Sequence, residues 1–324
     1  MKKVLVTGAA GYIGSVLVTK LLASGLMVRG VDNLRFGGDS LAAFSVHPAF
    51  EFVNVDIRDL HAVREAISGV DAVVHLAAIV GDPACAKEPQ LAEETNWVAS
   101  CKLFDLCNQS KNVERFVFAS TCSNYGKMAN DVLLTECSPL RPVSLYAQLK
   151  VRFEQYLLSS KTRVDFVPTA LRFATVYGLS PRMRFDLTVN EFIREATLKR
   201  ELVIFGEQFW RPYCHVDDLA GSIVLVLKTD TKKVDHNVFG VGDTGQNYQK
   251  KMLAEEILKI VPGVSIKYVK KEEDPRDYRV DFSKIKTQLG FSITKTVPDG
   301  LIEMHSILQS GLISDPYSKR YSNT

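Results

Sequence analysis

The chain has 324 residues, of which 46% are hydrophobic, and a formal net charge of +3 at pH 7. This composition is typical of a globular protein with a full core, and neither the small net charge nor any run of like charges indicates a basic surface for nucleic acid or an anionic membrane. No segment reaches the roughly 20 consecutive apolar residues of a membrane span, and the apolar run after the two N-terminal lysines is too short for a signal peptide. We therefore expect a soluble, cytoplasmic protein that binds neither nucleic acid nor membrane.

The first half of the chain alternates short apolar runs with segments of helical periodicity. Strands are predicted at 3–8, 27–33, 50–57, 71–78, 115–120 and 165–173, and helices at 12–25, 60–69, 93–110 and 144–160. This alternation predicts a parallel sheet covered on both faces, and right-handed crossovers then give a doubly wound, Rossmann-type α/β fold. A ligand belongs at the carboxyl ends of such strands, near the point where the strand order reverses.

After about residue 175 the alternation becomes irregular. A helix at 216–228 and a strand at 237–242 are predicted to return to the sheet, and further helices are predicted at 252–261 and 300–310. We expect residues 1–175, with returning segments near 213–242, to form a nucleotide-binding Rossmann domain. Residues 176–212 and 243–324 would then form a smaller, discontinuous α/β lobe that binds the substrate. The polar tail, 315–324, predicts a frayed terminus.

The segment "TGAAGYIG" places Gly8, Gly11 and Gly14 at three-residue intervals between the first strand and the first helix. Glycines there permit a tight turn and a close backbone approach, so that a pyrophosphate can lie on the helix N-terminus. Tyr12 and Ile13, inside the same segment, are therefore counted among the cofactor-binding residues.

Asp32 ends the second predicted strand, about 20 residues after the glycines, where a carboxylate accepts hydrogen bonds from the adenosine ribose. A carboxylate at this place repels the additional phosphate of NADP, so NAD is the favoured cofactor. Asn33, the next residue, is assigned to the same site, and Arg35 is interpreted as a solvated loop residue.

The segment "STCSNYG", residues 120–126, follows the fifth predicted strand, and Tyr146 and Lys150 lie four residues apart on the next predicted helix. Residues four apart share a helix face, so both side chains are expected in one site. A tyrosine has a reference pKa of about 10, and a nearby ammonium group favours its phenolate. Thr121, at the strand end, supplies a hydroxyl that could hold and relay the proton of a reacting alcohol.

The spacing G-x-x-G-x-x-G together with Y-x-x-x-K resembles the extended short-chain dehydrogenase/reductase family, and more narrowly its NAD-dependent epimerase/dehydratase branch, which works on nucleotide sugars. The resemblance runs along nearly the whole chain. It includes the segments "DIRD", "HLAA", "TN", "RPYCHVDDLA" and "YRVDFSKIKTQLGF".

The resemblance implies catalytic roles for Tyr146, Lys150 and Thr121 and a four-helix homodimer contact through the helices predicted at 93–110 and 144–160. The further cofactor contacts that it implies are Asp56, Ile57, Leu76, Ala77, Ala78 and Asn96, with His75 also lining the cofactor pocket. The substrate contacts that it implies are Arg211, one of Arg276 and Arg279, Thr175 in place of a frequent asparagine, and Cys122 and Ser123 beside the sugar. No metal site is implied.

The two residues after Thr121 narrow the choice of reaction. The 4,6-dehydratases of this branch carry an Asp-Glu pair there, and this chain has Cys122 and Ser123, which argues against a dehydratase or a decarboxylase. The 3- and 5-epimerases place a cysteine where Ser123 stands. Simple redox chemistry at C4 remains, which favours a 4-epimerase and keeps an NAD(P)-dependent 4-ketoreductase as the alternative. A non-catalytic NAD-binding protein is disfavoured because the glycines, the tyrosine and the lysine are all intact.

Overall fold

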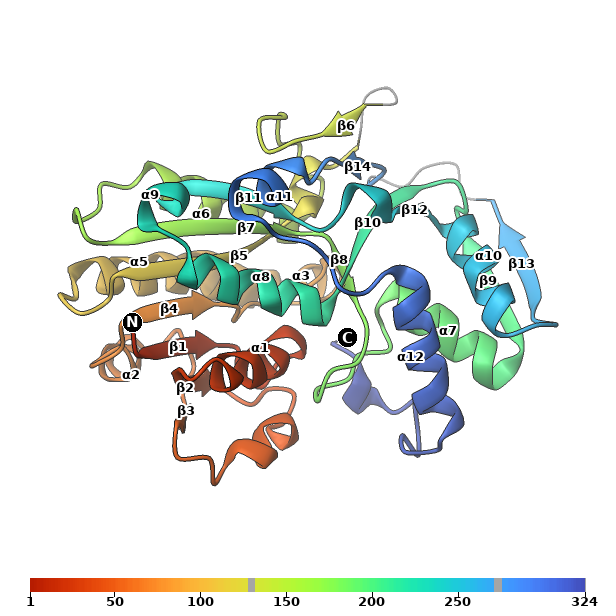
Figure 1. Cartoon of the computed structure of the whole chain (residues 1–324), viewed down its shortest axis with the longest axis horizontal. Helices are drawn as coiled ribbons and strands as arrows, with labels where there is room; N and C mark the ends of the chain where they lie inside the picture. The colour runs from red at the N-terminus through yellow and green to blue at the C-terminus, as the bar shows by residue number, and fades with distance from the viewer. Residues whose placement is uncertain (128–131, 271–275, 324) are drawn as a thin grey trace.

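The computed structural model describes residues 1–127, 132–270 and 276–323. Its centre is a seven-stranded sheet in the order β11-β7-β5-β4-β1-β2-β3, and every neighbouring pair is parallel (Figure 1). The strands are β1 Lys3–Thr7, β2 Met27–Asp32, β3 Phe50–Asn54, β4 Ala72–His75, β5 Arg115–Thr121, β7 Val167–Phe173 and β11 Asn237–Val241. The strand order reverses between β1 and β4, which confirms the predicted Rossmann-type fold.

Helices cover both faces of this sheet because its strands are apolar on both faces. Val4 and Val6 of β1 pack into one core, and Leu5 between them packs into another. The first face carries α1 Tyr12–Ala23 and α8 Val216–Lys228, and the second carries α2 Leu60–Ala66, α5 Ser100–Gln109 and α6 Leu145–Ser159. Within the described ranges, no helix has the length and apolar character needed to cross a membrane.

The single helix predicted at 93–110 is divided in three. Helix α4, Pro89–Glu93, leads into a π-helical segment at Glu94–Ala99, and α5 follows. Ser100 donates a hydrogen bond from Oγ to the Thr95 carbonyl oxygen, five residues back (3.0 Å), which satisfies an acceptor at this irregular turn. π-Helical turns are frequent at functional sites, and this one carries Asn96.

The second half of the chain builds a smaller assembly beside the sheet, with its own core (Figure 1). Its three-stranded sheet has the order β12-β10-β8, with β8 Thr175–Tyr177, β10 Trp210–His215 and β12 Asn247–Gln249, and a second sheet pairs β9 Glu201–Phe205 with β13 Ser265–Val269. A further short pair joins β6 Leu133–Leu134, from the first half of the chain, to β14 Arg279–Val280. Its helices are α7 Thr188–Lys199, α10 Lys250–Ile260 and α12 Val297–Gln309, and the shorter helices of the chain are α3 Asp82–Lys87, α9 Thr231–Val234 and α11 Ser283–Leu289. The division into a nucleotide domain and a substrate lobe stays a prediction.

The C-terminal tail is packed up to Asn323, so the prediction of a frayed terminus is wrong for the described residues. The Phe185 amide donates to the Tyr321 carbonyl oxygen (2.9 Å), and the two rings meet edge to face. A polar composition predicted fraying, but tertiary contacts with the second lobe hold this segment in place.

Candidate active site

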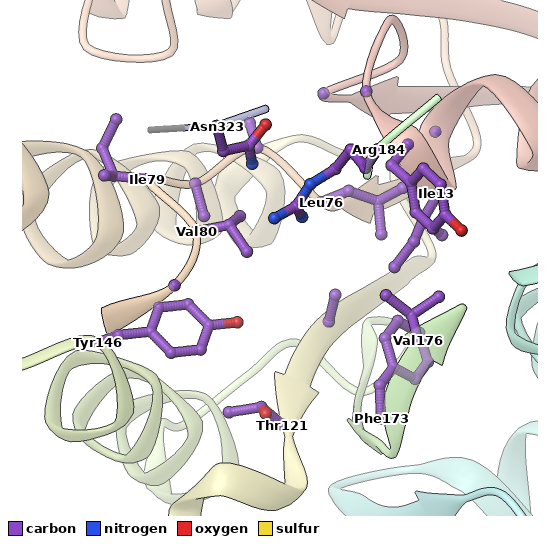
Figure 2. A pocket seen from close by; sticks show the side chains of 18 of the residues that line it. Ile13, Leu76, Ile79, Val80, Thr121, Tyr146, Phe173, Val176, Arg184 and Asn323 are labelled. Atoms are coloured by element: carbon purple, nitrogen blue, oxygen red, sulfur yellow. The ribbon is translucent and has the colours of Figure 1, made fainter. Parts of the chain in front are cut away.

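A cavity of about 440 Å³ lies along the carboxyl edge of the sheet, where the strand order reverses. Residues at or just after the ends of five strands line it: Gly8 after β1, Asp32 of β2, Leu76 after β4, Thr121 of β5 and Phe173 of β7. Figure 2 shows side chains from both halves of the chain meeting around this space. The predicted location of the ligand is therefore where the structure has its cavity.

The glycine loop fits a dinucleotide. Gly8 has φ +72°, and a Cβ atom at Gly14 would lie 2.0 Å from the Gly8 carbonyl oxygen, so neither position accepts a side chain without distortion. Gly11 precedes α1 without a side-chain cap, which leaves the N–H groups of the first helical turn available to a phosphate. Gly8, Gly11, Tyr12, Ile13 and Gly14 all line the cavity.

The end of the cavity that was predicted to hold the adenosine is formed around Asp32. Its carboxylate accepts hydrogen bonds from the amides of Ala10 (3.0 Å) and Leu34 (2.8 Å), and burial raises its pKa. Asn33 donates to the Asp56 carboxylate (3.1 Å), whose pKa the Arg58 guanidinium lowers to about 2. These side chains and Ile57 line one end of the cavity.

Two residues that were predicted to contact the cofactor, His75 and Asn96, do not line the cavity but lie behind the residues that line it. His75 is 1% exposed, its ring hydrogen-bonds to the hydroxyls of Thr7 (2.8 Å) and Ser100 (2.9 Å), and burial lowers its pKa to about 3. Asn96 donates to the Ile79 carbonyl oxygen (2.9 Å) and accepts from the Ile79 amide (2.8 Å). His75 therefore does not line the pocket as expected, and Asn96 fixes the loop that does. Leu76, Ala77 and Ala78 do line it.

Tyr146 and Lys150 lie on the cavity side of α6. Ser144 caps this helix by accepting from the Ala147 amide (3.3 Å). The Lys150 Nζ lies 5.9 Å from the centroid of the Tyr146 ring and donates to the Ala119 carbonyl oxygen at the end of β5 (2.7 Å). The Tyr146 hydroxyl points into the cavity, across from Thr121 (Figure 2).

The protein alone does not lower the pKa of this tyrosine. Burial raises the pKa of Tyr146, an effect that the positive charge of Arg184 opposes, and burial lowers the pKa of Lys150 to about 8. The phenol is therefore protonated near neutral pH in the ligand-free protein. An additional positive charge, such as that of a bound nicotinamide ring, would favour the phenolate.

The loop after Thr121 sends successive side chains in different directions. The Thr121 hydroxyl oxygen accepts from the Ser123 amide (3.1 Å), and both residues line the cavity. Cys122 is 1% exposed and directs its thiol to the Arg172 carbonyl oxygen (3.3 Å), and burial raises the pKa of that thiol. Cys122 was expected beside the sugar, but it lies outside the lining because the strand end turns its side chain into the core.

The second lobe contributes cationic side chains to the far end of the cavity. Arg211 lines it with its guanidinium 5.3 Å from the Tyr278 ring centroid, and Thr175 lines it as well. Arg276 also lines the cavity and pairs with Asp82 (3.1 Å). Arg279 stacks on the Trp210 ring (5.0 Å) outside the lining. Of the two arginines that the sequence left open, the geometry therefore favours Arg276.

A profile of the NAD dependent epimerase/dehydratase family matches residues 4–242. The chain belongs to this family. A UDP-glucose 4-epimerase from Lactobacillus helveticus is 29% identical over 309 residues, which cover 89% of this chain and 91% of that protein. A dTDP-glucose 4,6-dehydratase from Streptomyces griseus is 31% identical over 307 residues, 92% of this chain and 91% of that protein.

Solved structures of epimerase/dehydratase proteins superpose closely on this fold. The UDP-glucuronic acid 4-epimerase from Bacillus cereus, in complex with UDP-glucuronic acid and NAD, has a TM-score of 0.83 and 26% identity, over 95% of this chain and 99% of that one. The resemblance stated from the motifs is thus confirmed. The protein is an NAD-dependent enzyme of the extended short-chain dehydrogenase/reductase type.

Sequence reasoning missed part of the cavity wall in this epimerase/dehydratase protein. Phe36, Arg182, Arg184 and Asn323 line the cavity, and none was predicted to do so. The segment "SPRMRF" was a usable signal, because it places two arginines in one loop directly after the end of a strand. Asn323 had no such signal, since its place depends on the packing of the tail.

Proposed function

We propose that the protein is an NAD-dependent nucleotide-sugar 4-epimerase. Support comes from one arrangement: Tyr146, Lys150 and Thr121 line the cavity that also contains the glycine loop. Relatives named for UDP- and dTDP-sugars align along about nine tenths of the chain, and a UDP-glucuronic acid 4-epimerase shares its fold. The residues after Thr121 are Cys122 and Ser123, which offer no carboxylate for the elimination that a dehydratase performs.

In the proposed reaction, the Tyr146 phenolate takes the proton of the sugar C4 hydroxyl while the C4 hydrogen leaves as hydride. Bound NAD, which the glycine loop and Asp32 would hold, would supply the acceptor and the source of this hydride. Thr121 holds the reacting oxygen, and Lys150 stabilises the phenolate by its charge. Tyr146 then gives the proton back to the oxygen of the 4-keto sugar after the opposite face of C4 has been presented, which inverts this carbon with no net oxidation.

Binding energy from the nucleotide diphosphate would position C4. Arg211 and Arg276 suit this task because their forked donors match phosphate oxygens and because both line the end of the cavity formed by the second lobe. The ion pair of Arg276 with Asp82 joins that lobe to the first residue of α3.

A 4-ketoreductase is the second candidate, because it uses the same tyrosine, lysine and threonine. The experiment incubates the purified protein with UDP- and dTDP-hexoses without added cofactor and identifies products by NMR. An epimerase interconverts C4 epimers without net reduction of NAD. Stoichiometric consumption of added NADH or NADPH with a 4-keto sugar would instead establish the reductase, and a 6-deoxy-4-keto product would contradict both.

We also infer a homodimer formed through the outer surfaces of α5, α6 and the π-helical segment. Val98 on this surface is 38% exposed, and Trp97 packs edge to face on Tyr156 while the Arg152 guanidinium covers it. A partner helix pair would cover these side chains. Light scattering coupled to gel filtration tests the inference, and a monomer at micromolar concentration would contradict it.

A further inference from the structure

The last described residues cross from the second lobe to the nucleotide side of the cavity. The Tyr321 ring packs on Phe185, and its carbonyl oxygen accepts from the Phe185 amide (2.9 Å). Arg320 donates to the carboxylate of Asp39 (3.2 Å), which lies in the segment after β2. Asn323 extends over the cavity (Figure 2). The tail therefore connects the two halves of the molecule above the predicted cofactor position.

The loop that contacts this tail is fixed to the N-terminus of α1. Ser180 donates from Oγ to the Tyr12 carbonyl oxygen (2.7 Å) and hydrogen-bonds to the Ser15 hydroxyl (3.1 Å). Asn190 donates to the Tyr12 hydroxyl (3.0 Å) and to the Arg184 carbonyl oxygen (2.8 Å). Residues 180–184 are thus held against the helix end whose free N–H groups suit a phosphate.

Arg182 lies in this loop with part of its hydrogen-bonding capacity unused. It is 7% exposed, it lines the cavity, and its guanidinium lies 4.7 Å from the Phe36 ring centroid. Its Nη2 donates to the Ser322 carbonyl oxygen of the tail (3.1 Å). Its Nε and Nη1 are buried and have no acceptor among the described residues. Buried donors without partners are costly, so a ligand oxygen here would be stabilising.

Arg182 also lacks a direct carboxylate partner among the described residues. Asp186 accepts from Nε (2.9 Å) and Nη2 (2.7 Å) of Arg184, which leaves Arg182 without a carboxylate in contact within the described part of the chain. Burial and repulsion by Arg184 lower the pKa of Arg182 to about 10, although the charges of Asp186 and Asp32 oppose this shift. The Arg184 guanidinium projects into the cavity from the side opposite Thr121 (Figure 2). An anion bound between this loop and α1 would offset both the repulsion and the unmet donors.

We propose that Arg182, held by the C-terminal tail, binds the diphosphate of NAD from the side opposite the glycine loop. The dinucleotide is then enclosed between the N-terminus of α1 and a strap formed by residues 180–184 and 320–323. The inference deepens the proposed function and rests on it, because an epimerase must retain one cofactor through both hydride transfers. Arg182 acts here as a positioning residue that makes NAD a tightly held group.

The test compares wild type with Arg182→Gln, Arg182→Lys and a chain ending at Tyr321. NAD content after purification and the rate of exchange of bound NAD with isotopically labelled NAD are measured without any sugar nucleotide. Loss of charged hydrogen bonds predicts an exchange rate about tenfold to a hundredfold higher in Arg182→Gln, with a smaller increase in Arg182→Lys. The shortened chain should also exchange faster, because it lacks the Ser322 carbonyl that holds the guanidinium.

Arg64→Gln, at an exposed position on α2, is the matched control and should exchange NAD like wild type. Circular dichroism identifies any variant that fails to fold, in which case the remaining variants decide. Unchanged NAD content and exchange in the folded variants would overturn the inference. A loss confined to UDP affinity, measured by calorimetry on the same proteins, would assign the site to the substrate and overturn it as well. Absence of NAD from wild type would instead count against the proposed function.

Discussion

Two consecutive turns of α6 bury a charged residue in opposite ways. Lys150 faces the cavity at 4% exposure and, among the described residues, has no carboxylate within ion-pair distance. Four residues later, Glu154 is 1% exposed below the loop that follows β5 and pairs with Arg172 (2.6 Å). It also accepts hydrogen bonds from Ser120 (2.5 Å) and Asn124 (3.3 Å).

This difference in charge pairing distinguishes a residue of the candidate active site, Lys150, from a residue that stabilises the surrounding structure, Glu154. The Glu154–Arg172 pair is compensated and hydrogen-bonded, and Arg172 reaches on to the Tyr125 hydroxyl (3.1 Å), so the network fixes the loop that begins at Thr121. Lys150 keeps an uncompensated charge beside a phenol in a cavity, which costs stability and is useful only for chemistry or ligand binding. Helical spacing places Lys150 and Glu154 on one face of α6, so the difference in their charge pairing arises from the groups that each side chain contacts.

The largest effect on activity is expected at Tyr146, on the side of α6 that faces the cavity. Tyr146→Phe removes the proposed base, so kcat for epimerisation should fall about 10³-fold or more while the content of bound NAD stays unchanged. Tyr156→Phe on the same helix, which loses only a hydroxyl bonded to Asp105, should retain turnover. Steady-state kinetics and NAD content measure both, and a Tyr146→Phe enzyme within tenfold of wild type would refute the mechanism.

Removing the Glu154 carboxylate from its ion pair with Arg172 should instead lower the stability of the protein. Glu154→Gln leaves Arg172 buried without its carboxylate, so the free energy of unfolding should fall by about 3–5 kcal/mol. Glu256→Gln is the control, because Glu256 pairs with the exposed Lys259 on α10 (2.7 Å) and its loss should cost about 0–1 kcal/mol. Urea unfolding followed by circular dichroism compares the two variants. Equal decreases in the free energy of unfolding would show that the buried pair contributes no more stability than the surface pair.

The charge of Lys150 predicts a pH dependence. An unfolded lysine keeps its proton up to about pH 10.5, whereas burial lowers the pKa of folded Lys150 to about 8. Between these values the unfolded state binds more protons, so the free energy of unfolding of wild type gains a contribution that rises with pH. Lys150→Met abolishes this contribution. The free energy of unfolding of the variant relative to wild type should therefore fall by up to about 3 kcal/mol from pH 8 to 10.5, and a constant difference would contradict the lowered pKa.

The smallest effect is expected at the arginines of the second lobe, which repeat the contrast between a cavity position and a position outside it. Arg276→Gln should raise KM for the nucleotide sugar about tenfold, because Arg276 lines the cavity. Arg279→Gln, outside the lining, should change KM by less than about threefold. The reverse order would reassign the diphosphate contact to Arg279.

The sequence by itself determined the parts of this protein that depend on local periodicity. Apolar runs alternating with helical segments predicted the parallel sheet, glycine spacing predicted the dinucleotide turn, and the four-residue separation of Tyr146 and Lys150 placed both on one helix face. Each depends on backbone geometry over a few residues, which is the same wherever the pattern occurs.

Only the tertiary structure decided the direction of single side chains and the contacts between distant segments. In the folded chain the Cys122 side chain points into the core and Asn96 lies behind the lining of the cavity, whereas Asn323 and Arg182 line the cavity. Arg182 meets the Ser322 carbonyl across 140 positions of the chain. No local pattern encodes such a contact, because it forms only when the burial of whole lobes fixes where each segment lies.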